Sequence, residues 1–377
     1  MNIPYWRLSG FYFFYFAALG ALVPYWGLYL KSLGFSEVEI GELFAIIMAT
    51  KIIAPNVWGW IADHTGQRMQ IVRLASLLSV VCFTGVFLGS GFWWLVVVMV
   101  VFSFFWNASL PQFEATTMNH LQELTHRYSS IRLWGSVGFI IAVAGLGLAL
   151  EKFNISILPI VLLVLFAGIW INSLVVPEQS AGHLSNIHEP LREILARKNV
   201  LTLLFVCFLV QASHGPYYTF YSIYLEDNGY KRDLIGGLWA VSVLAEIGIF
   251  LVMHRLMPKF GPRNLLLTAL LLTMVRWLMI AGFIDSLPVL LLAQLLHAAS
   301  FGIIHAVAIH LIHKYFTGRH QGKGQALYSS ISFGAGGALG SLYSGYVWDG
   351  IGPAGIFYTS SAVIFLAFII TWKGIRD

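Results

Sequence analysis

The sequence predicts an all-helical membrane protein with twelve transmembrane helices in two six-helix halves. Three observations lead to this prediction: an apolar composition, a regular series of apolar segments, and a repeat that relates the two halves. Of the 377 residues, 58% are hydrophobic and only 10% are charged, whereas soluble domains carry about 25% charged residues. A soluble fold could not bury so much apolar surface, so lipid must act as a solvent for this chain.

Twelve apolar segments approach the length that crosses a bilayer, which is roughly 20 residues. Divided at charges and turn residues, they cover residues 8–31, 38–62, 70–89, 92–118, 130–150, 155–176, 200–225, 233–257, 263–283, 288–312, 325–347 and 354–372. A longer polar connection, residues 178–199, separates a first bundle (1–177) from a second (200–377). The first segment is too long for a signal-peptide core and has no A-x-A cleavage pattern, so we expect it to be retained.

The basic residues predict that both termini lie in the cytoplasm. With that orientation, only four of the 22 lysines and arginines fall in outer loops: Lys31, Lys152, Lys231 and Arg232. Cytoplasmic loops carry such an excess of basic residues. The net charge of +5 is scattered over short loops and forms no stripe, so we expect no nucleic-acid partner. Both cysteines lie inside apolar segments, which leaves no disulfide framework and no CxxC metal motif.

The two halves resemble each other at a nearly constant spacing. Residues 29–43 match residues 224–238 at an offset of 195, and Tyr128–Ile131 recurs as Tyr328–Ile331 at an offset of 200. Parallel repeats of six spans are the architecture of major facilitator transporters, whose binding site lies between the halves near mid-membrane.

The loop after the second span supports this resemblance. Gly59-Trp-Ile-Ala-Asp63-His-Thr-Gly66-Gln-Arg68 resembles the major facilitator signature G-x-x-x-D-x-x-G-x-R. Gly66 permits a tight turn, and Asp63 can pair with a basic residue or cap a neighbouring helix. We expect these four residues to form a gating loop that holds one conformation shut. The alternative is a turn whose charges only mark the cytoplasmic side.

Five charged residues fall within predicted spans, where an ionisable group costs about 2.5–3.5 kcal/mol to insert. They are Lys51, Glu114, Arg132, Glu246 and Arg276. Lys51 and Glu246 are 195 residues apart and therefore occupy equivalent positions of the repeat with opposite charge. We hypothesise that they meet across a central cavity.

The surroundings of these charges resemble the lactose permease branch of the superfamily. Glu114, followed eighteen residues later by Arg132 in Arg132-Leu-Trp134-Gly-Ser-Val-Gly-Phe139, matches its substrate-binding charge pair. In that branch an aromatic residue seven positions after the arginine stacks on the sugar, and here this residue is Phe139 instead of Trp. Over the whole chain, the sequence is most similar to the phenylpropionate permease group. The resemblance implies that Glu114, Arg132, Trp134 and Phe139 bind substrate.

Arg276 and His297 resemble the proton-coupling arginine and histidine of the same branch. The acidic residue that the branch has three positions after the histidine is Ser300 here, so its proton carrier is absent at that position. We expect Glu246, with Glu114 second and His297 as a polar relay, to carry the proton. A lone membrane histidine is also compatible with ordinary helix packing.

A small anion is the substrate that the charges favour. Three cations within the spans outnumber two carboxylates, so Lys51 and Arg276 would favour a negatively charged solute. Aromatic residues near the expected cavity would suit an aromatic ring, although each could equally belong to packing or to an interfacial belt. They are Tyr25, Trp26, Trp134, Tyr217, Tyr218, Tyr221 and Trp239.

The sequence therefore predicts a proton-coupled symporter that imports a small organic solute by alternating access, with 3-phenylpropionate as the favoured example. The alternatives are proton symport of a neutral sugar or nucleoside, and a proton-antiporting efflux pump. An enzyme is disfavoured because no HExxH, GxSxG or phosphate-binding loop occurs. We expect a monomer in a bacterial-type inner membrane, driven by the proton gradient without a cofactor or a metal.

Overall fold

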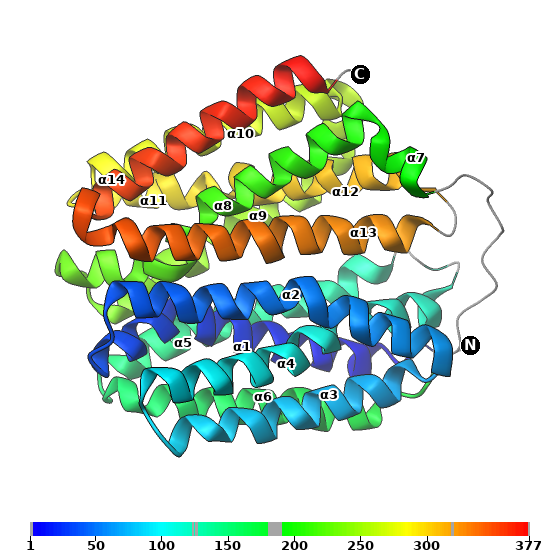
Figure 1. Cartoon of the computed structure of the whole chain (residues 1–377), viewed down its shortest axis with the longest axis horizontal. Helices are drawn as coiled ribbons and strands as arrows, with labels where there is room; N and C mark the ends of the chain where they lie inside the picture. The colour runs from blue at the N-terminus through cyan, green and yellow to red at the C-terminus, as the bar shows by residue number, and fades with distance from the viewer. Residues whose placement is uncertain (1–2, 123, 125–126, 180–190, 318–319, 376–377) are drawn as a thin grey trace. The chain divides into compact units, whose positions relative to one another are not determined.

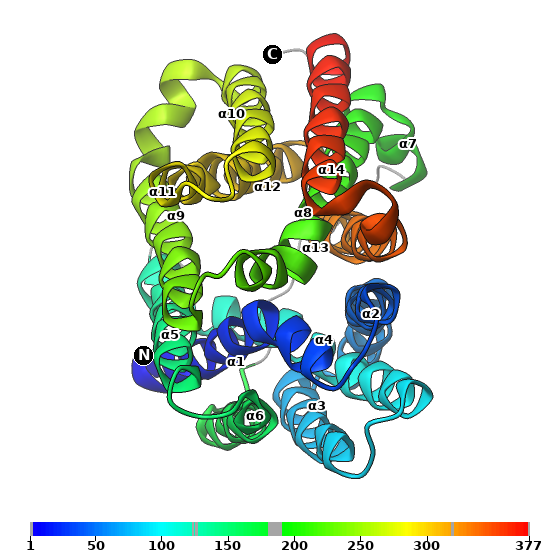
Figure 2. The same ribbon diagram turned by 90° about the vertical axis from the view of Figure 1, so that its left-hand side faces the viewer.

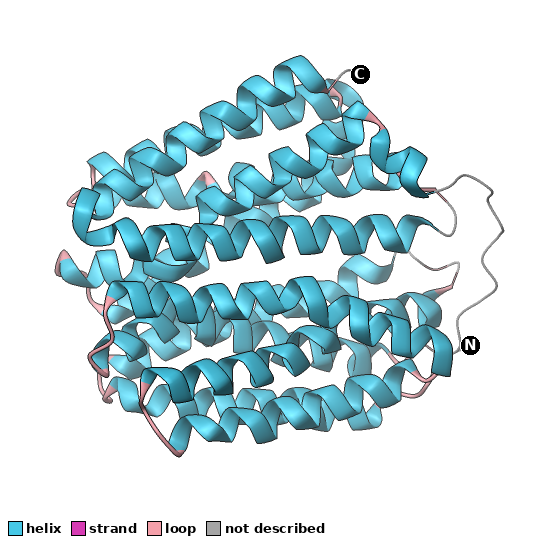
Figure 3. Ribbon diagram, in the orientation of Figure 1, coloured by secondary structure: helices cyan, strands magenta, loops and turns pink. Residues whose placement is uncertain are grey.

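The computed structural model describes residues 3–122, 124, 127–179, 191–317 and 320–375. Every regular element in these ranges is a helix (Figure 3). The described residues divide between two compact units. Unit 1 comprises residues 1–183 with 231–237, and unit 2 comprises residues 184–230 with 238–377. Most of the predicted connection 178–199 falls on residues 180–190, which lie outside the described ranges.

Unit 1 contains the six predicted spans of the first half. Its helices are α1 (Tyr5–Ser32), α2 (Glu37–Thr65), α3 (Arg68–Phe83, continued by the 3-10 turn η1, Thr84–Phe87), α4 (Phe92–Leu121), α5 (Tyr128–Leu150) and α6 (Leu158–Val175, preceded by η3, Ile155–Ile157). Helix α1 packs against α5 and α6, and α4 packs against α2 and α3 (Figure 2). The long apolar segments therefore form the helices that the sequence predicts.

The ends of α2 follow from local sequence. Ser36 accepts a hydrogen bond from the backbone N–H of Glu39, and the Glu39 carboxylate accepts one from the backbone N–H of Ser36, which together make a capping box. The helix ends at Gly66, whose φ of 69° lies in the left-handed region that glycine adopts without strain. The turn that the signature loop needs is therefore present.

Unit 2 contains the remaining spans and a short helix before them. Its helices are α7 (Leu191–Ala196), α8 (Lys198–Asp227), α9 (Arg232–Phe260, of which residues 232–237 belong to unit 1), α10 (Pro262–Gly282), α11 (Leu287–Leu295), α12 (Ile304–Tyr315), α13 (Gln321–Ser329) and α14 (Gly337–Gly374). Two π-helical segments, η4 (Ala298–Ile303) and η6 (Ser330–Gly336), connect α11 to α12 and α13 to α14. Helix α8 packs against α14 (Figure 1). Helix α10 packs against α14 and η4.

The described helices account for all twelve predicted spans. Ten helical runs are long and apolar enough to cross a membrane. One of these, Gln321–Gly374, holds two predicted spans, which Gly352 separates with a φ of 72°. Helix α2 lies at the remaining predicted span, residues 38–62. Large apolar side chains such as Trp93, Val164 and Leu251 are exposed on these helices, as lipid-facing residues must be. The all-α fold of twelve spans is confirmed.

Candidate functional site

A fully buried arginine lies at the centre of the polar groups of unit 2. Arg276 on α10 has no solvent-exposed surface. Its Nε donates to the backbone oxygen of Ala293 at 3.0 Å, and its Nη1 donates to the Ser300 hydroxyl at 3.1 Å. Its guanidinium lies 4.2 Å from the ring centre of Tyr217 and 4.5 Å from that of Trp277. All of these partners are neutral, so the positive charge is solvated but not cancelled.

A tyrosine–glutamine network surrounds this arginine. The Tyr217 hydroxyl donates to Gln294 Oε1 at 2.8 Å, and Gln294 Nε2 donates to the Tyr221 hydroxyl at 2.7 Å. Gln294 Oε1 also accepts from Arg276 Nη2 at 3.5 Å. The rings of Tyr217 and Trp239 lie 4.5 Å apart. These contacts join α8, α9, α10 and α11 around one aromatic and polar cluster.

The predicted proton-handling residues lie together in the same unit. His297 Nε2 is 3.7 Å from Glu246 Oε2, within ion-pairing distance when the histidine is protonated. The side chain of His297 is 6% exposed and that of Glu246 is 18% exposed. His297 Nδ1 is buried without a hydrogen-bond partner, and its ring centre lies 6.5 Å from that of His214. The structure thus brings the predicted carboxylate and its polar relay together.

The predicted substrate-binding charges of unit 1 are arranged differently from a simple ion pair. The Tyr128 hydroxyl donates to Glu114 Oε1 at 3.4 Å. The Arg132 guanidinium lies 3.7 Å from the ring centre of Phe16 and 5.6 Å from that of Tyr12. Both Glu114 and Arg132 are partly exposed. Each therefore has a neutral aromatic partner and keeps part of its surface exposed.

The other predicted contact residues of unit 1 have distinct surroundings. Trp134 Nε1 donates to the Tyr5 hydroxyl at 3.1 Å, so Trp134 is tied to the beginning of α1. Phe139 is 8% exposed and packs where α5 approaches α1. Lys51 is partly exposed on α2. Because Lys51 and Glu246 belong to different units, their hypothesised meeting stays a prediction.

The signature loop is fastened to a neighbouring helix. Arg68 forms an ion pair with Asp63, and its Nη1 donates to Gln112 Oε1 on α4 at 2.7 Å. Gly59 lies on the same stretch of α2, where an added Cβ would stand 3.5 Å from Gln112 Nε2. Gly59, Asp63 and Arg68 therefore lie at one contact between α2, α3 and α4, and Gly66 forms the turn after α2.

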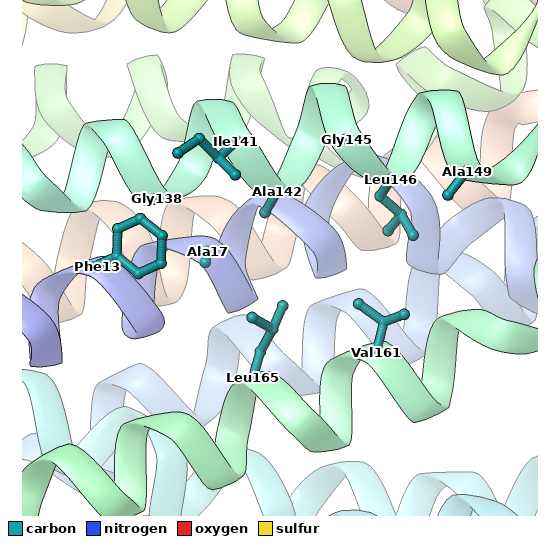
Figure 4. Close-up of a pocket in the computed structure, with 10 residues that line it drawn as sticks. All are labelled: Phe13, Ala17, Gly138, Ile141, Ala142, Gly145, Leu146, Ala149, Val161 and Leu165. Atoms are coloured by element: carbon teal, nitrogen blue, oxygen red, sulfur yellow. The ribbon is translucent and has the colours of Figure 1, made fainter.

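An apolar groove lies between α1, α5 and α6 in unit 1, with a volume of about 270 Å³. Figure 4 shows its lining: Phe13, Ala17, Gly138, Ile141, Ala142, Gly145, Leu146, Ala149, Val161 and Leu165. Apolar side chains and glycine give a carboxylate nothing to bind. No group of three or more His, Cys, Asp or Glu side chains in the described residues could hold a metal ion. The polar clusters are therefore the candidate site.

Some partners were not predicted from sequence. Tyr128 and Phe16 contact Glu114 and Arg132, and Ser300 provides a hydroxyl to Arg276. The sequence could have identified Tyr128, because this tyrosine recurs as Tyr328 in the internal repeat. Nothing in the sequence distinguishes Phe16, since it is one of many aromatic residues along α1.

Two bundles of apolar helices that bury ionisable side chains define a membrane transporter of the major facilitator type. More particularly, the chain belongs to the MFS_1 like family, which matches residues 5–359. Members of this family are transporters and not enzymes. The resemblance inferred from the sequence is confirmed.

The names of related proteins mention several different substrates. A "probable 3-phenylpropionic acid transporter" of Escherichia coli (strain K12) is 28% identical, covering 98% of this chain and 97% of its own length. The maltose permease of Geobacillus stearothermophilus is 26% identical, covering 94% of this chain and 91% of its own. The crystal structure of a mutant of the nucleoside transporter NupG aligns with a TM-score of 0.85 at 17% identity, over 99% of this chain and 100% of that one. The last likeness shows the fold alone.

Proposed function

We propose that this transporter is a proton-coupled symporter that imports an aromatic carboxylate such as 3-phenylpropionate by alternating access. The observation that carries the proposal is the Glu246–His297 contact of 3.7 Å beside a buried arginine. The carboxylate and the imidazole can each take up a proton, and no water or cofactor chemistry is needed for that step. The similarity to a probable 3-phenylpropionic acid transporter supports the choice of substrate.

Charge supports an anionic solute. Arg276 has only neutral partners among the described residues, so its positive charge contributes a field that favours an anion. Lys51 is partly exposed and would add to it. In unit 1, Arg132 would bind the carboxylate and Glu114 would orient the solute, with Phe139 and Trp134 contributing aromatic surface. Glu246, assisted by His297 and secondarily by Glu114, would carry the proton.

The gating loop and the orientation complete the proposal. The Asp63–Arg68–Gln112 contact would hold the end of α2 against α4 in one conformation and release it in the other. The protein would act as a monomer in a bacterial inner membrane with both termini in the cytoplasm. Residues 1–177 and 200–377 would move as the two rocking bundles.

Net charge distinguishes the proposed substrate from its rivals. One proton carried with one monoanion moves no net charge, so a pH gradient should drive uptake and a membrane potential alone should not. A proton carried with a neutral sugar or nucleoside moves one positive charge, which a potential of 100 mV drives with about 2.3 kcal/mol.

The test is uptake of radiolabelled 3-phenylpropionate, maltose and uridine into proteoliposomes. The pH gradient and a valinomycin-set potassium potential are imposed separately. We expect uptake of the arylalkanoate alone, driven by the pH gradient, abolished by a proton ionophore, and lost in Arg132→Ala. Potential-driven uptake of the sugar or nucleoside would replace the proposal with the neutral-solute symporter. Proton-driven export would replace it with the efflux pump.

A further inference from the structure

A row of stacked rings extends from the Glu246–His297 pair along the tenth span. The ring of His297 stacks on Phe301 with centroids 5.6 Å apart and planes 13° apart, and Phe301 stacks on His305 at 5.4 Å and 9°. On an ideal α-helix, two side chains eight residues apart point in directions that differ by about 80°. The π-helical segment η4 lies between His297 and His305, and its turn contains more residues than an α-helical turn. Both rings therefore fall on one face of the span.

Close packing against α9 fixes this segment beside Glu246. An added Cβ at Gly302, on η4, would collide with the Ile249 side chain and would stand 3.7 Å from Glu246 Cγ. Only a residue without a side chain allows α9 to approach here. The π-helix therefore lies directly against the helix that carries the proposed proton carrier, which agrees with the frequent occurrence of π-bulges at functional sites.

The far end of the row is a hydrogen-bonded pair. His305 Nδ1 and the hydroxyl of Tyr328, which is 4% exposed, are 3.0 Å apart. Tyr328 is the repeat equivalent of Tyr128, whose hydroxyl donates to Glu114. Each half thus holds a titratable side chain of its fourth span against the equivalent tyrosine of its fifth. The partner of this tyrosine is an imidazole in unit 2 and a carboxylate in unit 1.

Phe301 separates the two histidines. Its ring contacts both imidazoles and also Phe333 of the second π-segment, with centroids 6.3 Å apart. Titratable and charged groups from the neighbouring helices lie near the row: Glu246, His214, Cys207, Tyr218, Arg276 and Tyr328. Because a phenyl ring has no group that takes up or passes on a proton, the row of rings itself offers no direct path from His297 to His305 while Phe301 holds this position.

We propose that His305 and Tyr328 form the proton-release pair of the transporter, and that Phe301 is the barrier between this pair and Glu246–His297. The proposal rests on the proton coupling proposed above. When the Phe301 ring moves aside, one proton leaves the protonated Glu246–His297 pair, water carries it, and the neutral imidazole of His305 accepts it. No other bond is made or broken. With the termini in the cytoplasm, His305 lies about 12 Å further along the span towards the cytoplasm.

The first test measures proton release by full-length protein in proteoliposomes. His305→Gln should lower pH-gradient-driven uptake of 3-phenylpropionate by about a hundredfold, the lower end of the range for loss of an acid–base group. Counterflow, the exchange of labelled for unlabelled solute, needs no proton release and should stay at the wild-type rate. His310→Gln, an exposed histidine on the same helix, is the matched control and should leave both rates unchanged.

The second test measures the barrier. In vesicles that contain pyranine, Phe301→Ala should raise substrate-independent proton flux several-fold over the wild type. Leu292→Ala removes an exposed side chain of the same span and should not raise it. An unchanged leak in Phe301→Ala would overturn the role of the barrier.

The outcomes separate this inference from the proposed function. If wild-type uptake moves no protons, the proposed function fails. If wild-type uptake is proton-coupled and His305→Gln matches it, only the release pair is wrong. If His305→Gln also loses counterflow, the test is repeated with Tyr328→Phe, which removes a single oxygen atom. Uptake at the wild-type rate in Tyr328→Phe would overturn the release pair. Loss of uptake with counterflow intact would support it.

Discussion

The contact between helices α8 and α14 in unit 2 is close enough to be tested by one substitution. They meet at Gly215 and Gly340, where the two backbones are in contact. An added Cβ at Gly215 would stand 2.5 Å from Gly340 Cα and 2.6 Å from Ser341 N. Because these are backbone atoms of a helix, no side chain can rotate away. Small residues of this kind allow membrane helices to approach closely, so Gly215→Ala should force α8 and α14 apart.

The expected cost follows from two opposing effects. Overpacking in a rigid site costs about 3 kcal/mol, the upper part of its usual range. Replacing a helical glycine by alanine regains about 1 kcal/mol of helix propensity. The net destabilisation is then about 2 kcal/mol, which lowers the melting temperature of a unit this size by about 4–8 °C.

Thermal unfolding of the detergent-purified protein measures this difference. Gly248→Ala is the matched control, because Gly248 lies within α9 of the same unit and an added Cβ there has no atom within 4 Å. The control should melt at or slightly above the wild type. If Gly215→Ala melts as high as Gly248→Ala, the two helices are not in backbone contact and the reasoning is refuted.

Three further substitutions have expected effects on stability, each measured by the same melts. Ser36→Ala removes the capping box of α2 and should cost about 1 kcal/mol; no change would mean that the cap is not formed. Gly66→Ala places a side chain at a φ of 69° and should cost about 1–2 kcal/mol, whereas a stabilised variant would contradict the left-handed turn. Gln294→Met removes the hydrogen-bond partner that the Tyr217 and Tyr221 hydroxyls share, and should lower the free energy of unfolding by about 3 kcal/mol. Wild-type stability would show that the network does not form.

The helical framework could be predicted because its cause is local. A run of about 20 apolar residues must form a helix in lipid whatever it packs against, so the predicted span 130–150 became α5, Tyr128–Leu150. The break within the last long helix was also predicted, since the gap between residues 347 and 354 contains Gly352 and Pro353. The π-helical segments were not, because nothing in Ala298–Ile303 distinguishes it from an α-helical turn.

The partners of the charges could not be predicted because they depend on how neighbouring helices pack. The sequence placed Arg132 and Arg276 within spans and required that their charges be compensated. One arginine lies over Phe16 and the other is held by Ser300 and Tyr217. A rotation of either helix by one residue, about 100°, would have brought different side chains to these guanidinium groups.

The predicted arginines of the two units differ in exposure, and this difference bears on mechanism. Glu114, Arg132 and Lys51 of unit 1 are partly exposed, and so is Glu246 of unit 2, whereas Arg276 is fully buried and His297 nearly so. A side chain that binds a solute must be reached by that solute, while a proton needs only a narrow path and benefits from exclusion of bulk water. We therefore infer that the first half contacts the carboxylate and the second half handles the proton. Substitutions at Arg132 should then change apparent affinity for the solute, and substitutions at Glu246 should leave counterflow intact while abolishing uptake against a gradient.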